Sequence, residues 1–153
     1  MKLRISLACA ALVVLALPFV ASAGSPTDRA TGGGQVLIGS RGGAGDTIAF
    51  TAQDRATNLG QVQYVDRAAT GQTVLHGTVT CLDVMGDMAK IGGLWRDGGT
   101  FQIIVIDNGE GALADDDVVT VQNGQPNDCD TEDDDDDNPI ALARGNAQVY
   151  DAP

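Results

Sequence analysis

Short runs of Val, Ile, Thr, Phe and Tyr recur along most of the chain, separated by turns that are rich in Gly and Asp. The pattern is clearest at residues 101–105, where Phe101, Ile103 and Val105 fall on one face of an extended segment. No segment has the periodicity of an amphipathic helix. About eight strands are therefore predicted, at residues 34–40, 46–53, 60–67, 73–84, 88–96, 100–107, 117–122 and 146–152.

Glycine-containing turns connect these strands closely. Residues 84–89 read VMGDMA and residues 95–101 read WRDGGTF, and each stretch predicts a tight hairpin between neighbouring strands. Short strands with tight connections are typical of a small antiparallel β-sandwich or barrel. We therefore predict an all-β fold. Its core should be light in aromatic side chains, and the large ones expected there are Phe50, Tyr64, Trp95 and Phe101.

The beginning of the chain has the features of a secretory signal peptide. Lys2 and Arg4 form a basic start, an apolar run follows, and small residues end it, so cleavage is expected after Ala23. The apolar run is short and ends in a cleavage site, so no membrane span is expected once the signal is removed. The expected divisions are a signal peptide at 1–23, a flexible Gly-rich lead-in at 24–34, and a single β-domain at 35–153 with an acidic loop at 128–138.

The charge balance is strongly acidic. The sequence has 21 Asp and Glu residues against 9 Lys and Arg residues, which gives a formal net charge of −12. Loss of Lys2 and Arg4 with the signal peptide makes the remaining chain more acidic still. Such a surface repels nucleic acid and anionic membranes, so nucleic-acid binding is not expected.

The cysteine content agrees with export. Cys9 lies inside the signal peptide, which leaves Cys81 and Cys129 as an even pair. In an oxidising compartment such a pair predicts a disulfide. Closing a loop of ~50 residues stabilises a fold by about 4 kcal/mol in the chain-entropy model. The alternative is two free, buried thiols.

His76 is the only histidine and lies five residues before Cys81. In an extended strand the two residues are about 16 Å apart, too far to share a metal ion. This spacing also places them on opposite faces of a regular strand, although a bulge at Gly77 would reverse that relation. We interpret His76 as an ordinary strand residue. No Ser stands in a nucleophile-elbow sequence, so no catalytic residue is assigned.

Two acidic segments are candidate cation sites. Asp133–Asp137 cannot all face one ion, and the run lacks the glycine and glutamate of an EF-hand loop, so we interpret it as a solvated acidic loop. The segment 107–117 offers oxygen ligands from both ends of one loop. The alternative there is a Gly-rich hairpin loop with positive φ at Asn-Gly. The weak candidates for calcium ligands in this segment are Asp107, Asn108, Glu110, Asp115 and Asp117. No other cofactor is expected.

Several segments resemble a known domain. GGGQ, FTAQ, GQVQYVD, VLHGTVTCLDV, AKIGG and GTFQIIVIDNGE are similar to the post-COAP domain, a small secreted bacterial β-domain that follows choice-of-anchor modules in surface proteins. The resemblance covers residues 32 to about 150, and HGTVTC and DNGE are its most specific parts. It implies pairing of Cys81 with a later cysteine, which Cys129 matches, and no assigned catalytic activity. The chain lacks the usual Pro after DNGE and has an unusual Asp run, which leaves the hairpin shape and the role of the acidic loop open.

Together these features predict a secreted, non-enzymatic binding or structural module, with an extracellular or cell-surface partner, outside or on the surface of a bacterium. One alternative is a calcium-dependent binding module that uses the loop carboxylates. Another is a small-ligand-binding barrel or an uncharacterised enzyme, with His76 as its titrating group. A filled interior would favour a surface-acting module, and an open lumen would favour ligand binding inside the sheet.

Overall fold

The computed structural model describes residues 27–36, 45–56, 59–67, 71–110, 115–125, 129 and 140–153. The predicted signal peptide lies outside these ranges, and the acidic loop at 128–138 is described only at Cys129. No helix in the described ranges is long and apolar enough to cross a membrane. The strands are β1 Arg29–Val36, β2 Asp46–Gln53, β3 Gly60–Asp66, β4 Thr73–Met85, β5 Met88–Trp95, β6 Thr100–Ile106, β7 Val118–Asn123 and β8 Leu142–Tyr150.

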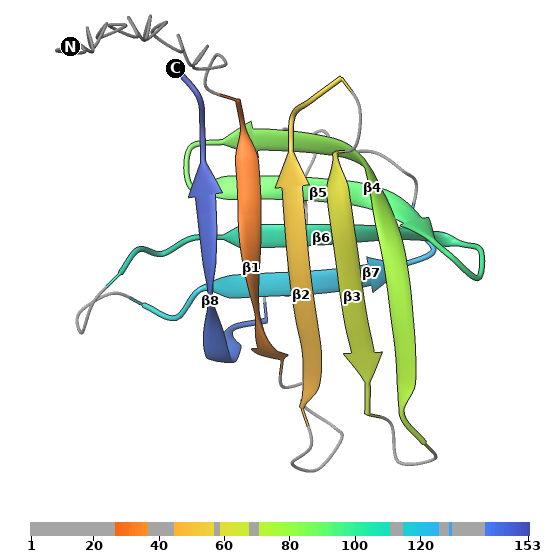
Figure 1. Ribbon diagram of the computed structural model, residues 1–153. Coiled ribbons are helices and arrows are strands. Elements are labelled where there is room, and N and C mark those ends of the chain that lie inside the picture. Colours follow the sequence, from red (N-terminus) through yellow and green to blue (C-terminus); the bar gives the residue numbers. More distant parts are fainter. Residues whose placement is uncertain are drawn as a thin grey trace, which may run out of the picture.

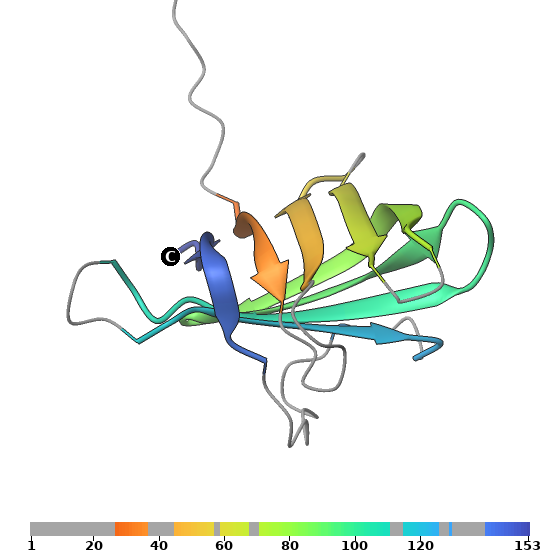
Figure 2. The ribbon, with the colours of Figure 1, turned by 90° about the horizontal axis from the view of Figure 1, so that it is seen from below.

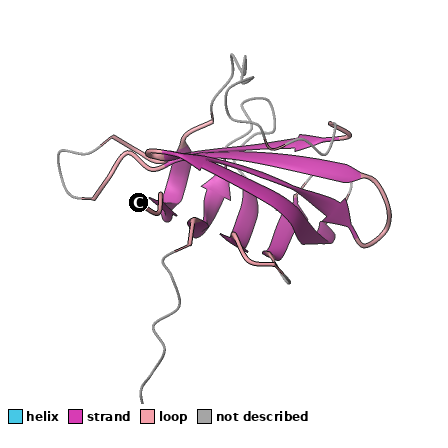
Figure 3. Cartoon of the chain, turned by 90° about the horizontal axis from the view of Figure 1, so that it is seen from above, coloured by secondary structure: helices cyan, strands magenta, loops and turns pink. Residues whose placement is uncertain are grey.

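All eight strands belong to one antiparallel sheet with the order β7-β6-β5-β4-β3-β2-β1-β8. The sheet folds over itself, so that β8, β1, β2 and β3 form a front layer that crosses a back layer of β5, β6 and β7 (Figure 1). The long strand β4 takes part in both layers, and views along the layers show them facing each other (Figures 2 and 3). The predicted all-β fold is confirmed as a nearly closed, barrel-like sheet.

Turn chemistry explains the connections between the strands of the back layer. Met85 pairs with Met88 across a two-residue turn, and Gly86 has a φ of 65°. The next turn follows Trp95, and Gly98 and Gly99 have φ values of 100° and 89°. Glycine adopts positive φ without a steric cost, which is why these positions can reverse the chain so tightly. Both predicted hairpins are confirmed.

One apolar cluster occupies the space between the two layers. Phe101 is fully buried there, and its ring centroid lies 4.4 Å from that of Trp95. Gly77 and Gly93 make room for Phe101, since a Cβ atom at either glycine would lie within 2.4 Å of its ring. The interior is thus filled by side chains. The four aromatic residues predicted for the core, Phe50, Tyr64, Trp95 and Phe101, are all buried.

A β-bulge in β4 allows this strand to pass from one layer to the other. The register with β5 shifts between Val79 and Cys81. A bulge bends its strand and adds one residue that has no partner. Val79 and Leu82 both face the core as a result, so Cys81 points outward, as His76 does. The opposite-face relation expected for a regular strand therefore does not hold. The alternative with a bulge does, although the bulge lies between Val79 and Cys81 and not at Gly77.

The disulfide between Cys81 and Cys129 is present, with a Cα–Cα distance of 6.0 Å. Cys129 is buried, and on the outer side of the back layer Gln102 and Ile104 are buried too. The alternation in β6 predicted its core-facing residues correctly. It did not predict that the opposite face is also covered. The back layer is therefore buried on both faces, whereas the front layer is buried on one.

The beginning of the domain differs from the expectation. Residues 29–34 were assigned to a flexible lead-in, but they belong to β1, which pairs with β2 on one side and β8 on the other. A Cβ atom at Gly32 would lie 2.7 Å from the carbonyl oxygen of Asn146, and one at Gly34 would lie 2.2 Å from that of Arg144. The glycines in β1 thus permit close approach of two backbones. Gly-rich composition was misread as flexibility.

The two ends of the sheet meet along a seam between β7 and β8. A single bridge pairs Val118 with Ala141. Beyond the bridge, two carboxylates take the place of a neighbouring strand. The amide of Ala147 donates to Asp117 Oδ2 at 2.7 Å, and the amide of Val149 donates to Asp107 Oδ2 at 3.0 Å. These acceptors satisfy N–H groups at the edge of β8 that would otherwise lack partners.

Candidate functional site

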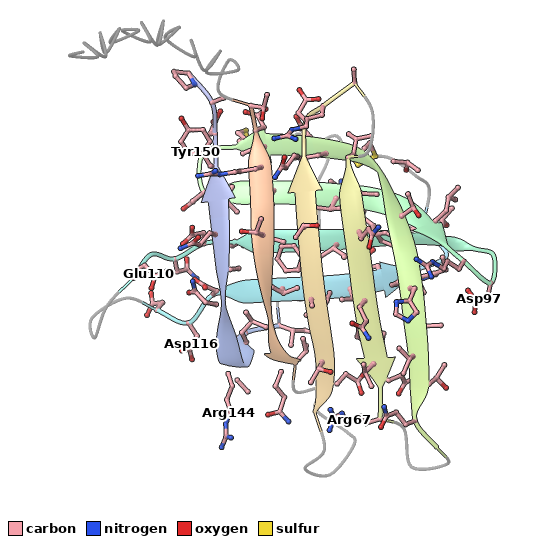
Figure 4. The ribbon with its side chains drawn as sticks, in the orientation of Figure 1. Arg67, Asp97, Glu110, Asp116, Arg144 and Tyr150 are labelled. Atoms are coloured by element: carbon pink, nitrogen blue, oxygen red, sulfur yellow. A yellow bond between two sulfur atoms is a disulfide. The ribbon has the colours of Figure 1, made fainter. Side chains whose placement is uncertain are left out.

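The outer surface of the front layer, with the adjoining half of β4, is the candidate site. In these strands alternate side chains enter the core, and the others point outward. We call this outward surface the open face, and Figure 4 views it from the front. It consists of Arg29, Thr31, Gly33, Gln35, Thr47, Ala49, Thr51, Gln53, Gln61, Gln63, Val65, Val74, His76, Thr78, Arg144, Asn146, Gln148 and Tyr150.

None of the residues of the open face is Asp or Glu. The whole chain, in contrast, carries 21 acidic residues. The acids that the structure describes lie at strand ends, in turns and on the back layer. Figure 4 shows Glu110, Asp116 and Asp97 beside the open face, on loops that extend from the back layer. The charge is therefore segregated, with acids around a neutral to basic surface.

Strand register aligns the polar side chains in rows across the open face. One row is made of amide and hydroxyl side chains only, and it crosses five strands. Neighbouring strands are about 4.8 Å apart, so this row extends over roughly 19 Å. The next row has small residues at its centre. The first row is Gln148, Thr31, Thr51, Gln61 and Thr78, and the second is Asn146, Gly33, Ala49, Gln63 and His76.

A shallow depression of about 560 Å³ lies over β2, β3 and β4 on this surface. Thr51, Gln61, Gln63, His76 and Arg96 contribute its polar lining. The amide of Arg96 donates to the carbonyl of His76 at 2.9 Å, which fixes the start of the β5–β6 turn beside β4. No carboxylate is among the described residues that line this depression.

A second depression, of about 320 Å³, lies at the other end of the open face against β8. The guanidinium of Arg29 lies 5.0 Å from the ring centroid of Tyr150. Asp107 and Glu110 line this depression as well, so here the loop carboxylates border the open face. The two ends of the open face therefore differ, because the end at Arg96 has no acid in its lining.

His76 is exposed on the open face, opposite Gln63 of β3. Acid–base catalysis by a histidine usually uses a carboxylate that orients the ring. Among the described residues that line the depression, none supplies one. The enzyme alternative therefore gains no support from the placement of His76.

Four of the five predicted calcium ligands accept or donate hydrogen bonds within the protein at the seam: Asp107, Asn108, Glu110 and Asp117. Asp107 Oδ1 accepts the amide of Gly109 at 2.9 Å, and Asp117 Oδ1 accepts the amide of Asn108 at 3.1 Å. Glu110 Oε1 accepts the side-chain amide of Asn146 at 2.8 Å. Gly109 has a φ of 88°, as expected for Asn-Gly in a hairpin loop.

Asp115 is exposed, and within the described ranges it takes no part in these hydrogen bonds. Among the residues that the structure describes, no three His, Cys, Asp or Glu side chains are arranged to hold a metal ion. Asp133–Asp137 lie outside the described ranges. Asp107 and Asp117 act in this structure as acceptors that close the sheet.

Sequence reasoning missed Asp46, a buried carboxylate at the start of β2. It accepts the hydroxyl of Tyr64 and, at 2.8 Å, the amide of Arg67. These hydrogen bonds offset the cost of burying the carboxylate, so we assign Asp46 a structural role. The open face was also missed. The signal that could have found it is the near absence of acids from the interiors of the predicted strands 46–53 and 60–67, where Asp46 and Asp66 stand only at or near the ends.

Comparison of the chain with protein-family models, with curated proteins and with solved structures finds no match. The similarity to the post-COAP domain therefore stays a prediction.

Proposed function

We propose that this protein is an exported, non-enzymatic binding module and that the open face is its binding surface. The single observation that carries the proposal is the absence of Asp and Glu from the outward positions that five adjacent strands contribute to the open face, in a chain with a net charge of −12. Acidic side chains on exposed strand positions would add solubility. Their exclusion from one continuous surface is what a binding site for a neutral or anionic ligand requires.

Export is supported by two features. The first residues have the pattern of a signal peptide, and the disulfide between Cys81 and Cys129 suits an oxidising compartment. A module that leaves the cell meets its ligand outside or at the cell surface. There the ligands available in large amounts include the polysaccharides of envelopes and matrices.

The side chains of the open face favour an extended polar ligand over a protein. Protein interfaces are usually centred on buried aromatic or large aliphatic anchors. The large exposed apolar residues on this surface are Val74 and Tyr150, which lie on β4 and β8 at opposite ends of it. The centre carries amides and hydroxyls, which both donate and accept hydrogen bonds, as sugar hydroxyls do. We therefore propose a hydroxyl-rich polymer as the ligand.

The calcium-dependent alternative has one supporting observation. Asp107 and Glu110 line the depression at the β8 end of the open face, so a cation there would lie beside the binding surface. Both carboxylates already accept hydrogen bonds from β8. Binding of a cation would have to preserve these hydrogen bonds or replace them. We place this function second for that reason.

The proposal can be tested with the mature protein and a panel of neutral and acidic polysaccharides, by affinity electrophoresis. Wild type should be retarded by at least one polysaccharide. Thr51→Asp places an acid at the centre of the open face, at an exposed position, and should weaken binding at least tenfold. The matched control Gln125→Asp adds the same charge at an exposed site after β7 and should bind as wild type does. Equal binding by Thr51→Asp, or no retardation of wild type by any polysaccharide, would contradict the proposal.

A further inference from the structure

We infer that the ligand of the open face is an acidic polysaccharide, whose carboxylate or sulfate groups bind Arg96 and Arg144 while its hydroxyls bind the amide rows between them. This inference rests on the proposed function, and it adds the chemical class of the ligand.

The distribution of basic residues is its first support. The described arginines are Arg29, Arg55, Arg67, Arg96 and Arg144, and all lie on the open face or at its border. The sixth described cation, Lys90, is buried in the back layer. Figure 4 shows Arg144 and Arg67 along one edge of the open face, at the ends of strands. Within the described ranges, the exposed basic residues of this acidic protein therefore lie around one surface.

The second support concerns the partners of these arginines within the described ranges. Among the described residues, neither Arg96 nor Arg144 forms an ion pair with a carboxylate. A guanidinium binds a carboxylate or sulfate through two parallel hydrogen bonds, which makes arginine well suited to such groups. Asp97 follows Arg96 in the turn and is exposed at its outer end (Figure 4). Arg96 itself lines the depression with His76.

The third support is the surface between the arginines. Arg144 lies on β8, and Arg96 lies beyond β4, so a ligand that contacts both must cross all five strands of the open face. Along that path Gly33 and Ala49 have no side chain or a short one, so little projects from the surface there. Gln61 and Gln63 line the depression. An extended sugar chain has hydroxyls for these amides and separated charges for the two arginines.

Other polyanions fit the same surface less well. Single-stranded nucleic acid binds through stacking of bases on aromatic side chains, and the one aromatic residue of the open face, Tyr150, is already covered by Arg29. An acidic peptide would need a free strand edge or apolar anchors, which the centre of this surface lacks.

The test uses two polymers with the same backbone. Polygalacturonate carries a carboxylate on each sugar, and its fully methyl-esterified form carries none. Calorimetric titration of the mature protein should give an affinity for polygalacturonate at least tenfold higher than for the ester. A second pair, dextran sulfate and dextran, distinguishes sulfate from carboxylate as the anionic group. Binding to the charged polymer should weaken as salt is raised, because ions screen exposed charges.

Variants assign the effect to the arginines. Arg96→Gln and Arg144→Gln should each weaken binding to the charged polymer by about fivefold to tenfold, with little change for the ester. Met85→Glu changes the net charge by the same amount at an exposed position beside the β4–β5 turn, at the opposite end of β5 from Arg96, and should have no effect. Arg96→Lys should restore part of the affinity. Thermal unfolding of each variant checks that the fold is retained.

The outcomes separate the two proposals. Equal affinity for the charged and esterified polymers, with loss of both in Thr51→Asp, would overturn the acidic ligand and leave the binding function in place. Equal weakening by Met85→Glu and Arg96→Gln would also overturn it, since net charge alone would explain the effect. Equal affinity for a single-stranded oligonucleotide would show general polyanion binding and overturn it too. No binding of any polysaccharide would overturn both proposals.

Discussion

The front and back layers of this sheet have different surroundings, although both are built from short antiparallel strands. Strand β6 in the back layer is buried on both faces, whereas β2 and β3 in the front layer alternate between buried and exposed positions. The outer face of β6 is therefore covered, whereas the outer face of the front layer is exposed to solvent. Stability depends most on the covered layer, and binding is expected on the uncovered one.

Removing Phe101 should have the largest effect on stability, because its ring is packed between the layers against Trp95, Gly77 and Gly93. Phe101→Ala should lower the free energy of unfolding by about 3–5 kcal/mol, as measured by urea denaturation. Gln61→Ala, on the open face, is the matched control and should stay within about 0.5 kcal/mol of wild type. Similar losses for the two variants would contradict the contrast between the layers.

The disulfide should come next. Replacing both Cys81 and Cys129 by Ser should lower the free energy of unfolding by about 2–4 kcal/mol, since the unfolded chain regains the freedom of the closed loop. Because this link lies on the back layer, binding to the open face should be unchanged well below the melting temperature. Loss of polysaccharide binding in a variant that is still folded would show that the two layers are coupled.

Opening the seam should have a smaller effect. Asp117→Ala removes the acceptor for the amides of Ala147 and Asn108 and should cost about 1–3 kcal/mol. Hydrogen exchange at the Ala147 amide should become faster. The neighbouring exposed Asp116→Ala serves as the control, because only the backbone oxygen of Asp116 accepts a hydrogen bond from Asn108.

The same variant tests the calcium alternative. If Asp117 acts only as a hydrogen-bond acceptor, added calcium should leave the difference in melting temperature between wild type and Asp117→Ala unchanged. A rise that occurs in wild type and is absent from Asp117→Ala would identify Asp117 as a calcium ligand.

The sequence predicted most strands to within one or two residues, because alternation and turn residues are local signals. Strand β2 was predicted with its observed bounds, and the turns at Gly86 and at Gly98-Gly99 follow from the φ values that glycine allows. Strand β8 was expected to begin at residue 146 and begins at Leu142. Its first residues, Leu142-Ala143-Arg144-Gly145, have no apolar alternation, and pairing with β1 makes them a strand.

By itself, the sequence determined the all-β class, the core-facing residues Phe101, Ile103 and Val105 of β6, and Cys81 and Cys129 as a pair able to form a disulfide. These properties depend on side-chain chemistry and on neighbours a few residues away. Only the tertiary structure decided that glycines of β1 lie between two backbones, that Asp107 and Asp117 close the seam, and that polar residues from five strands form one surface without acids. Each of these depends on register between segments far apart in the chain, which local patterns do not specify.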